Sequence, residues 1–237
     1  MHRVFISDLH LSEETPKIEA ALSDLLLRDP LPDSVVILGD FFEAWVGDDD
    51  DSPLADRLRE LLFATSRRSC ELLIGRGNRD FMLGQRFAED VGAKLLSDET
   101  LFEVAGEQAV LLHGDTLCTD DKDYQAFRTM VHDVAWQTEM MAKDLEERRE
   151  LARQLRALSI DAASNKPEDI MDVNPEAVDA LMSKSNARIM IHGHTHRPAR
   201  HALLAGERIV LGDWSESSGW LLREKDESLT LEQFLIR

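Results

Sequence analysis

Residues 71–81 read ELLIGRGNRDF, and this stretch contains the pattern that decides the fold. A strand-like apolar run, ELLIG, stops at a glycine-containing turn that carries Asn78, Arg79 and Asp80. The side-chain oxygen of Asn78 is able to coordinate a metal ion, and Asp80 is either a further ligand or an anchor for the turn. The cation Arg79 between them is unexpected at a metal site. The rest of the chain decides whether this turn is catalytic or an ordinary loop.

Four other short apolar runs end in the same way, each followed by side chains that are able to bind metal. Runs of about five aliphatic residues without polar alternation are typical of strands buried on both faces. Helical patterns separate the first runs, and strands that alternate with helices indicate a layered α/β fold. Ligands in such folds gather at the carboxyl ends of the strands, so we expect all five clusters at one rim. The runs are RVFIS (3–7), SVVIL (34–38), ELLIG (71–75), AVLL (109–112) and ARIMI (187–191).

A long segment between the fourth and fifth runs breaks this alternation. It has strongly helical patterns at 124–158 and 175–185. An insertion of this length between two rim-forming strands is expected to cover the rim as a helical cap. The alternative is that these helices pad the core or form a dimer contact. We predict one structural domain with a core of 1–118 and 187–237 and a cap insertion of 119–186.

Seven candidate ligands follow the five runs, and their joint arrangement indicates a metal centre. Each motif alone is weak, because a polar residue after a strand is often only part of a turn. The two histidines of GHTH are a stronger signal, since they are able to face one region. Seven ligands suit two ions that share a carboxylate, and imidazole, carboxylate and amide ligands without thiolate favour Mn, Fe or Zn over Ca. The candidates are Asp8, His10, Asp40, Asn78, His113, His194 and His196.

A two-metal centre of this kind suits phosphoryl transfer. Two ions about 3.5–4 Å apart clamp the attacking and leaving oxygens, and metal-bound water loses its proton near neutral pH. No serine or cysteine nucleophile is then needed. The other histidines lack such a pattern: we expect His192 to be packed in its strand, and His2, His132 and His201 to lie at the surface.

Composition narrows the class of protein. The 237 residues include 46 acidic and 27 basic side chains, and a net charge of −19 argues against a broad nucleic-acid-binding face. Cys70 and Cys118 lie far apart in or beside apolar runs, which fits reduced cytosolic thiols. No secretory signal or apolar run of membrane-spanning length is evident. From residue 200 onward, short strand patterns are expected to complete a second sheet.

These motifs, D-L-H, G-D, G-N-R-D, H-G-D and G-H-T-H, resemble those of the calcineurin-like metallophosphoesterase family. The resemblance implies a double β-sandwich flanked by helices, with Asp40 as the ligand that bridges two metal ions. It assigns one ion to Asp8, His10 and His196 and the other to Asn78, His113 and His194.

Arg79 narrows the expected reaction. Many members of this family carry a histidine at this position, which is able to protonate a departing alkoxide. Arginine cannot give up a proton near neutral pH, whereas a phosphate leaving group needs no proton and is stabilised by a guanidinium. The turn therefore favours cleavage of a phosphoanhydride over a simple phosphomonoester. The alternative is that Arg79 is an ordinary surface residue.

A narrower resemblance covers essentially the whole chain. SDLHLSEETP, LGDFFEAWVGDD, GNRDFMLG, IMDVN, IHGHTHRPA and RIVLGDW are similar to sequences of the UDP-2,3-diacylglucosamine pyrophosphohydrolase family. This implies two Mn²⁺ ions and hydrolysis of UDP-2,3-diacylglucosamine to UMP and 2,3-diacylglucosamine 1-phosphate (lipid X) in lipid A biosynthesis. It implies catalytic and phosphate-facing roles for Asn78, Arg79 and His194, and substrate-binding roles in the cap for Asp121, Ser159 and Lys166. Ala163 departs from the family, which usually has a polar residue there.

The resemblance also gives the cap a purpose. Its apolar residues, such as Val131, Val134, Trp136, Met140 and Met141, are candidates to line a groove for two acyl chains. Arginines 149, 153 and 156 are candidates for contact with anionic head groups, which implies a cytoplasmic protein peripheral to the inner membrane. The alternatives are a soluble nucleotide pyrophosphatase or phosphodiesterase of the same superfamily, or an inactive scaffold with the same fold.

Overall fold

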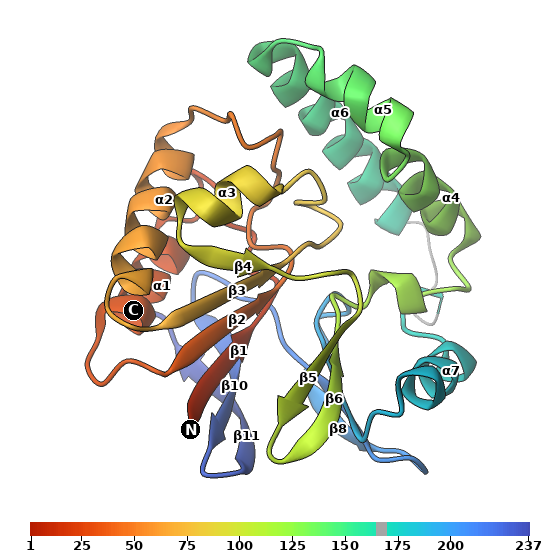
Figure 1. The fold of residues 1–237 in the computed structure, drawn as a ribbon. Helices are drawn as coiled ribbons and strands as arrows, with labels where there is room; N and C mark the ends of the chain where they lie inside the picture. Colours follow the sequence, from red (N-terminus) through yellow and green to blue (C-terminus); the bar gives the residue numbers. More distant parts are fainter. Residues whose placement is uncertain (165–169) are drawn as a thin grey trace.

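The computed structural model describes residues 1–164 and 170–237 and contains two β-sheets that face each other (Figure 1). The first sheet has six strands in the order β11-β10-β1-β2-β3-β4, and the second has five in the order β5-β6-β7-β9-β8. The first comprises β1 (His2–Ile6), β2 (Ser34–Leu38), β3 (Glu71–Gly75), β4 (Ala93–Leu95), β10 (Ser218–Lys225) and β11 (Ser228–Leu235). The second comprises β5 (Thr100–Val104), β6 (Glu107–Leu111), β7 (Ile189–His192), β8 (Ala199–Ala202) and β9 (Glu207–Val210). The layered α/β fold expected from the sequence is confirmed.

The five predicted strands form, but they are divided between the sheets. β1, β2 and β3 run parallel in the first sheet, and β6 and β7 run parallel in the second. The prediction that the C-terminal strands complete the second sheet is correct only for β8 and β9. β10 instead pairs antiparallel with β1, with Phe5 opposite Leu222, and β11 pairs with β10. This pairing places Leu222 in the core between the sheets.

The alternation of side chains along each strand builds three apolar layers. Val4 and Ile6 of β1 face the helices, whereas Phe5 between them faces the second sheet and packs in the same cluster as Ile191 and Ile209. α1 (Pro16–Leu27), α2 (Pro53–Ser66) and α3 (Gln85–Asp90) cover the outer face of the first sheet. α7 (Pro175–Ser185) packs against the outer face of the second.

Among the described residues, four helices lie within the predicted cap region 119–186: α7 and, before it, α4 (Lys122–Val131), α5 (Val134–Met141) and α6 (Leu145–Ser164). Figure 1 shows α4, α5 and α6 as a group set apart from the helices on the first sheet. The helical pattern is divided into three helices because Asp133 and Asp144 act as N-caps. Their side chains accept hydrogen bonds from backbone N–H groups at the starts of α5 and α6. α7 packs on the second sheet, so it differs from α4–α6 in its surroundings. The boundaries 119–186 for a cap remain a prediction.

Candidate metal centre

The candidate ligands lie on the loops that follow β1, β2, β3, β6 and β7. Five of them adopt the left-handed backbone conformation, which is uncommon for residues other than glycine and concentrates at functional sites. These turns change the direction of the backbone just after each strand, so that the side chains of different loops meet at one place. These residues are Asp8 (φ 57°), His10 (φ 51°), Asp40 (φ 49°), His194 (φ 68°) and His196 (φ 53°).

Asp40 lies at the centre of the site and is buried. Its Oδ1 accepts a hydrogen bond of 2.8 Å from the backbone N–H of Arg79 and lies 3.6 Å from Nε2 of His113. Its Oδ2 lies 3.8 Å from Nε2 of His10. The two carboxylate oxygens therefore face imidazoles from opposite halves of the candidate ligand set, as a bridging ligand requires.

One group of ligands surrounds Asp8. Nε2 of His10 lies 3.3 Å from Nε2 of His196, which in turn lies 3.4 Å from Oδ1 of Asp8. The backbone N–H of His194 also donates to both oxygens of Asp8. Ligand atoms of Asp8, His10 and His196 lie within 4.8 Å of one another, and so do those of Asp8, Asp40 and His113. Asp8 is therefore within reach of both groups.

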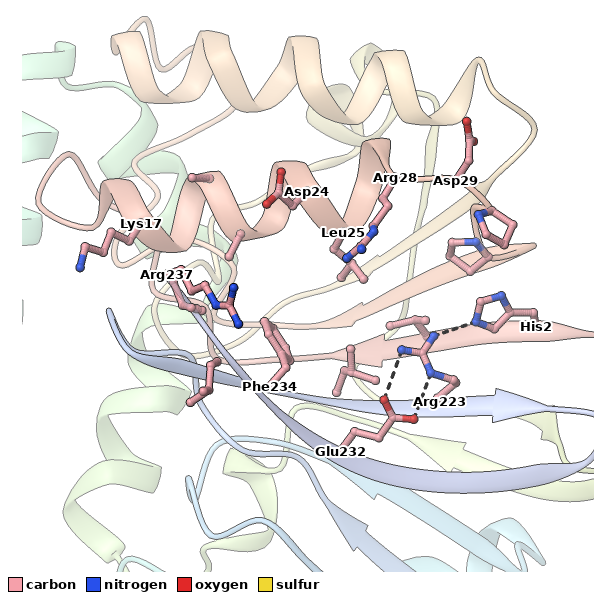
Figure 2. Close-up of a pocket in the computed structure, with 18 residues that line it drawn as sticks. His2, Lys17, Asp24, Leu25, Arg28, Asp29, Arg223, Glu232, Phe234 and Arg237 are labelled. Atoms are coloured by element: carbon pink, nitrogen blue, oxygen red, sulfur yellow. Dashed lines mark hydrogen bonds and ion pairs between the residues drawn. The ribbon is translucent and has the colours of Figure 1, made fainter.

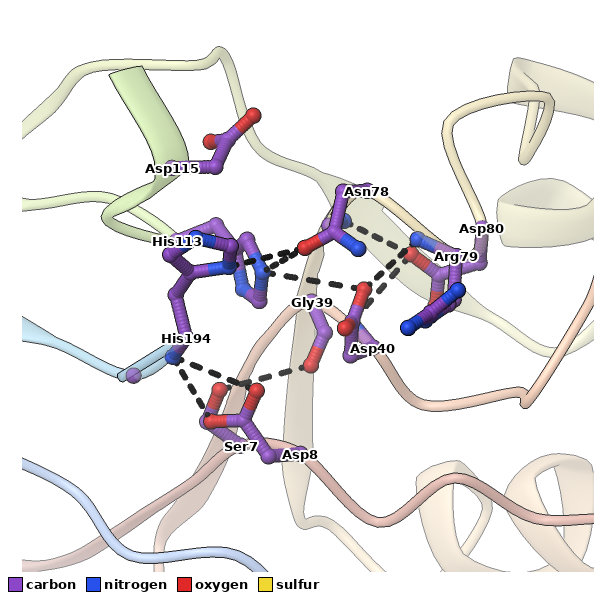
Figure 3. A network of polar contacts seen from close by, with 12 residues as sticks. Ser7, Asp8, Gly39, Asp40, Asn78, Arg79, Asp80, His113, Asp115 and His194 are labelled. Carbon is purple, nitrogen blue, oxygen red and sulfur yellow. Dashed lines mark hydrogen bonds and ion pairs between the residues drawn. The ribbon is translucent and has the colours of Figure 1, made fainter. Parts of the chain in front are cut away.

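The second group centres on Asn78. Its Oδ1 lies 3.0 Å from Nε2 of His113 and 2.8 Å from Nδ1 of His194 (Figure 3). The ring of His113 is held in this direction because its Nδ1, 2.9 Å from the carbonyl oxygen of Leu38, donates a hydrogen bond to it. Nε2 of His113 then faces the site. The structure thus brings all seven candidate ligands to one place, six of them in these two groups and Asp40 between the groups.

The carboxylates give this region a strong negative potential. Burial lowers the pKa of His113, but the nearby charges of Asp40, Asp8 and Asp115 outweigh burial and raise that pKa to about 9. Burial lowers the pKa of His194 to about 4, together with the repulsion of His113. The carboxylates thus keep His113 protonated although His194 lies beside it, and the same negative charge would attract a metal cation. The donor set, with oxygen and imidazole nitrogen atoms from both groups, fits divalent metal ions.

Asp80 is an anchor and not a ligand. Its buried carboxylate accepts hydrogen bonds from the backbone N–H groups of Gly77 (2.6 Å), Phe41 (2.8 Å) and Asp40 (3.2 Å). Burial and the adjacent Asp40 raise the pKa of Asp80 to about 6. The residue ties the turn after β3 to the turn after β2, so it fixes Asn78 relative to Asp40.

Asp115, which follows His113 in the chain, also faces away from the ligands (Figure 3). Its Oδ2 accepts hydrogen bonds from the hydroxyl of Tyr124 (2.7 Å) and from Nε of Arg128 (2.8 Å), both on α4. The ring of Tyr124 lies 5.9 Å from that of His194. Asp115 therefore fastens α4 to the rim and places Tyr124 beside the site, a neighbour that the sequence did not indicate.

α6 is fastened to the loop between β2 and α2. The buried guanidinium of Arg148 donates to both oxygens of Asp49, at 2.7 and 2.5 Å, and to the carbonyl oxygen of Val46 at 2.7 Å. Arg149 pairs with Asp50 and Asp51. These contacts give the acidic run DDDD (48–51) a structural role that the sequence did not reveal.

The predicted substrate residues have different surroundings. The Arg79 side chain is largely enclosed, and its Nε is buried without a hydrogen-bond partner among the described residues. Burial lowers the pKa of Arg79, and Asp40 opposes this effect. Asp121 is buried and accepts a hydrogen bond from the backbone N–H of Tyr124 at the start of α4. Ser159 is exposed on α6. The side chains of Ala163 and Lys166 lie outside the described part of the chain.

His192 is packed in its strand, as predicted. It is fully buried, its Nδ1 lies 2.9 Å from the carbonyl oxygen of Gly193, and its Nε2 lies 3.5 Å from Arg208. His201 is exposed as expected, whereas His2 and His132 are half-buried. His2 contacts Arg223, and His132 lies beside the ring of Phe81.

One surface cavity lies away from the candidate ligands. It has a volume of about 960 Å³ and lies between α1 and the β10–β11 hairpin, with Lys17, Arg28, Arg223 and Phe234 among its walls (Figure 2). None of the seven candidate ligands lines it. The described helices include none that is both long and apolar enough to cross a membrane.

Comparison with known proteins agrees with this geometry. Residues 1–198 match the model of a family described as calcineurin-like phosphoesterase. The chain is 44% identical over 239 residues to a protein named UDP-2,3-diacylglucosamine hydrolase from Cellvibrio japonicus, and 43% identical over 239 residues to one of that name from Escherichia coli O7:K1. Each match covers 99% of both chains. A structure described as that of a novel archaeal phosphodiesterase superposes with a TM-score of 0.50 at 12% identity over 99% of both chains, which shows a shared fold.

Proposed function

We propose that this chain, which belongs to the calcineurin-like phosphoesterase family, hydrolyses the pyrophosphate bond of UDP-2,3-diacylglucosamine. The products are UMP and 2,3-diacylglucosamine 1-phosphate (lipid X). The observation that carries the proposal is the meeting of two ligand groups at Asp40, whose Oδ1 also accepts the backbone N–H of Arg79. The full-length similarity to proteins named for this substrate supports the choice among phosphoesters.

The metal part of the proposal is two Mn²⁺ ions. Asp8, His10 and His196 would hold one ion, Asn78, His113 and His194 would hold the other, and Asp40 would contribute to both. Such ions, when bound, act as Lewis acids and lower the pKa of water.

The remaining chemistry falls to side chains of this protein. The guanidinium of Arg79, whose Nε is buried without a partner among the described residues, is free to bind phosphate oxygens. It neutralises charge on the departing sugar phosphate, which leaves without being protonated. Asn78 and His194 orient the phosphate, and Asp121, Ser159 and Lys166 bind the substrate from the helical segment.

The helical segment α4–α6 serves as the cap and receives the acyl chains. Its contacts with the rim, through Asp115 and through the arginines of α6, support a position above the ligands. Of the expected groove residues, Val131 and Met140 are buried, and Trp136 lies beside Phe81 at 5.9 Å between ring centroids. Burial of each methylene of the acyl chains contributes about 0.8 kcal/mol.

Peripheral contact with the cytoplasmic side of the inner membrane is part of the proposal. Exposed apolar side chains support this contact better than the arginines of α6 do. Arg149, Arg153 and Arg156 each pair with carboxylates, which reduces their attraction for anionic lipids. Val134 and Leu158 are instead exposed, at 77% and 66%. Flotation with phosphatidylethanolamine vesicles should therefore recover the protein with little dependence on added phosphatidylglycerol or salt. Recovery only with anionic vesicles at low salt would restore the electrostatic explanation.

A direct assay tests the reaction. The purified protein should release UMP from UDP-2,3-diacylglucosamine in the presence of Mn²⁺ and not in EDTA. It should act poorly on deacylated UDP-glucosamine. Equal turnover of both substrates would favour the alternative, a nucleotide pyrophosphatase for small substrates. In ¹⁸O-water we expect the label in UMP, because water attacks the phosphorus attached to uridine, and label in the sugar phosphate would reverse that assignment.

A further inference from the structure

Glu43 lies beside the candidate ligands although no ligand pattern includes it. The loops after β1 and β2 run side by side past the ends of the strands. His10 N–H donates to the carbonyl oxygen of Asp40, Leu11 N–H donates to that of Phe41, and Glu43 N–H donates to that of Leu11, each at 3.0 Å. This short ladder fixes the backbone of Glu43 relative to the backbone of His10.

The Glu43 side chain points toward the imidazole of His10. Its Oε2 lies 3.0 Å from Nδ1 of His10, a buried nitrogen that makes no hydrogen bond of good geometry with any described residue, so the carboxylate of Glu43 is its charged neighbour. Nε2 of the same ring faces the ligand group, 3.3 Å from Nε2 of His196. A carboxylate only accepts hydrogen bonds when ionised, so it favours the tautomer with a proton on Nδ1 and a lone pair on Nε2.

We propose that Glu43 is a positioning residue for His10, and that Arg156 of α6 holds Glu43 in place. The proposal rests on the proposed function in so far as His10 binds a metal ion. His113 has an equivalent partner, the carbonyl oxygen of Leu38, which holds its Nδ1. A partner on the second ring nitrogen fixes the ring and its tautomer, and loss of such a partner typically weakens metal binding by about 10–100-fold.

Arg156 extends this arrangement to the helical segment. Its Nε forms an ion pair with Oε1 of Glu43, the oxygen that His10 does not use. One carboxylate therefore joins α6 to a candidate metal ligand. Movement of α6 away from the rim removes the partner that holds Glu43, so the seating of α6 and the affinity of one metal site change together.

Metal titration of the chelator-stripped, full-length protein tests the proposal without any turnover. Mn²⁺ binding is followed by calorimetry and by electron paramagnetic resonance. Glu43→Ala should weaken one of two Mn²⁺ sites by about 10–100-fold and leave the other unchanged. Glu43→Gln keeps an acceptor for the imidazole N–H and should lose much less. Equal affinities for wild type and Glu43→Ala, or equal weakening of both sites, would overturn the role of Glu43.

Arg156→Ala tests the link to α6, and Arg153→Ala is the matched control because Arg153 pairs only with Glu146 and Glu150 among the described residues. Arg156→Ala should weaken the same site by a few-fold, whereas Arg153→Ala should not. No difference between the two variants would remove α6 from the proposal.

A spectroscopic readout separates positioning from general damage to the fold. In the metal-free wild type, ¹⁵N chemical shifts should show that His10 carries its proton on Nδ1. In metal-free Glu43→Ala they should show a mixture of the two tautomers, at an unchanged melting temperature. The same single tautomer in both proteins would contradict the proposal. If the wild type fails to cleave the acylated UDP-sugar, the proposed function falls, but these metal and tautomer measurements still decide the role of Glu43.

Discussion

At the scale of single residues, the position of Asp40 leads to a difference between two variants. Asp40 faces both ligand groups, whereas Asn78 belongs to one group and is uncharged. Asp40→Ala should therefore lose both metal ions and all measurable activity. Asn78→Ala should retain one ion and a residual rate. Metal content by mass spectrometry and kcat decide the matter, and similar metal contents would move the bridging role to Asp8, which also reaches both groups.

Arg79 gives a second prediction at this scale. Arg79→Ala should lower kcat on the pyrophosphate substrate by about 10²–10³, or roughly 2.7–4 kcal/mol, because it removes a charge contact in an enclosed site. Lysine should recover part of the loss, since it offers a point charge instead of a planar fork. Arg79→His should remain poor on the pyrophosphate yet gain on an alkyl phosphodiester, whose leaving group needs a proton. Comparison of kcat/KM for both substrates, at constant metal content, tests this. Normal pyrophosphate cleavage by Arg79→Ala would make the arginine a bystander.

At the scale of elements, the attachment of α6 to the loop after β2 is open to a direct test. Arg148 is 3% exposed, and its removal leaves Asp49 and a backbone carbonyl without their donor. Arg148→Ala should lower the free energy of unfolding by about 1–3 kcal/mol and raise KM for the diacylated substrate.

The control for this prediction is a small aryl phosphodiester, which does not need the cap. Its hydrolysis by Arg148→Ala should match the wild type, because no candidate ligand contacts Arg148. A loss of activity on both substrates, or an unchanged KM for the lipid, would show that Arg148 does not act by positioning α6.

The elements also show what sequence can and cannot predict here. The five strands and the meeting of the seven candidate ligands were predictable because their signal is local: an apolar run of strand length followed at once by a side chain able to bind metal. Glu43 and Arg148 were missed because their partners lie on other elements, so only the folded chain brings the charges together. The ends of α4 and α5 had a local signal, since Asp133 and Asp144 are good N-cap residues inside a helical pattern. β10 was misplaced because pairing partners of antiparallel strands cannot be read from either strand alone.

At the scale of the whole molecule, the candidate ligands come from both sheets. Asp8, His10, Asp40 and Asn78 follow strands of the first sheet, and His113, His194 and His196 follow strands of the second. A bound ion should therefore stabilise the native state by about 2.7 kcal/mol at a free concentration of 100 times its dissociation constant. EDTA should lower the melting temperature, and Mn²⁺ should restore it. A melting temperature independent of metal would argue against ligands contributed by both sheets.

The two thiols report on the same global stability. Burial raises the pKa of Cys70 from 9.0 to about 11 and that of Cys118 from 9.0 to about 12. Between pH 9 and these values the native state binds more protons than the unfolded state, so the free energy of unfolding falls as pH rises through this window. At pH 8 iodoacetamide should modify both cysteines only in denaturant, as mass spectrometry will show. Rapid modification of the native protein would contradict this burial.

The pairing of β1 with β10 has a consequence for how the chain is made. β1 leaves the ribosome well before β10, yet they are neighbours inside one sheet, with His2 opposite Lys225. Until the C-terminal hairpin emerges, β1 presents an open edge that other chains are able to pair with. Asp8 and His10 lie just beyond that edge. The sheet that carries Asp8 and His10 is therefore complete on this side only after β10 has been made, and the nascent chain depends on keeping the edge of β1 unpaired until then.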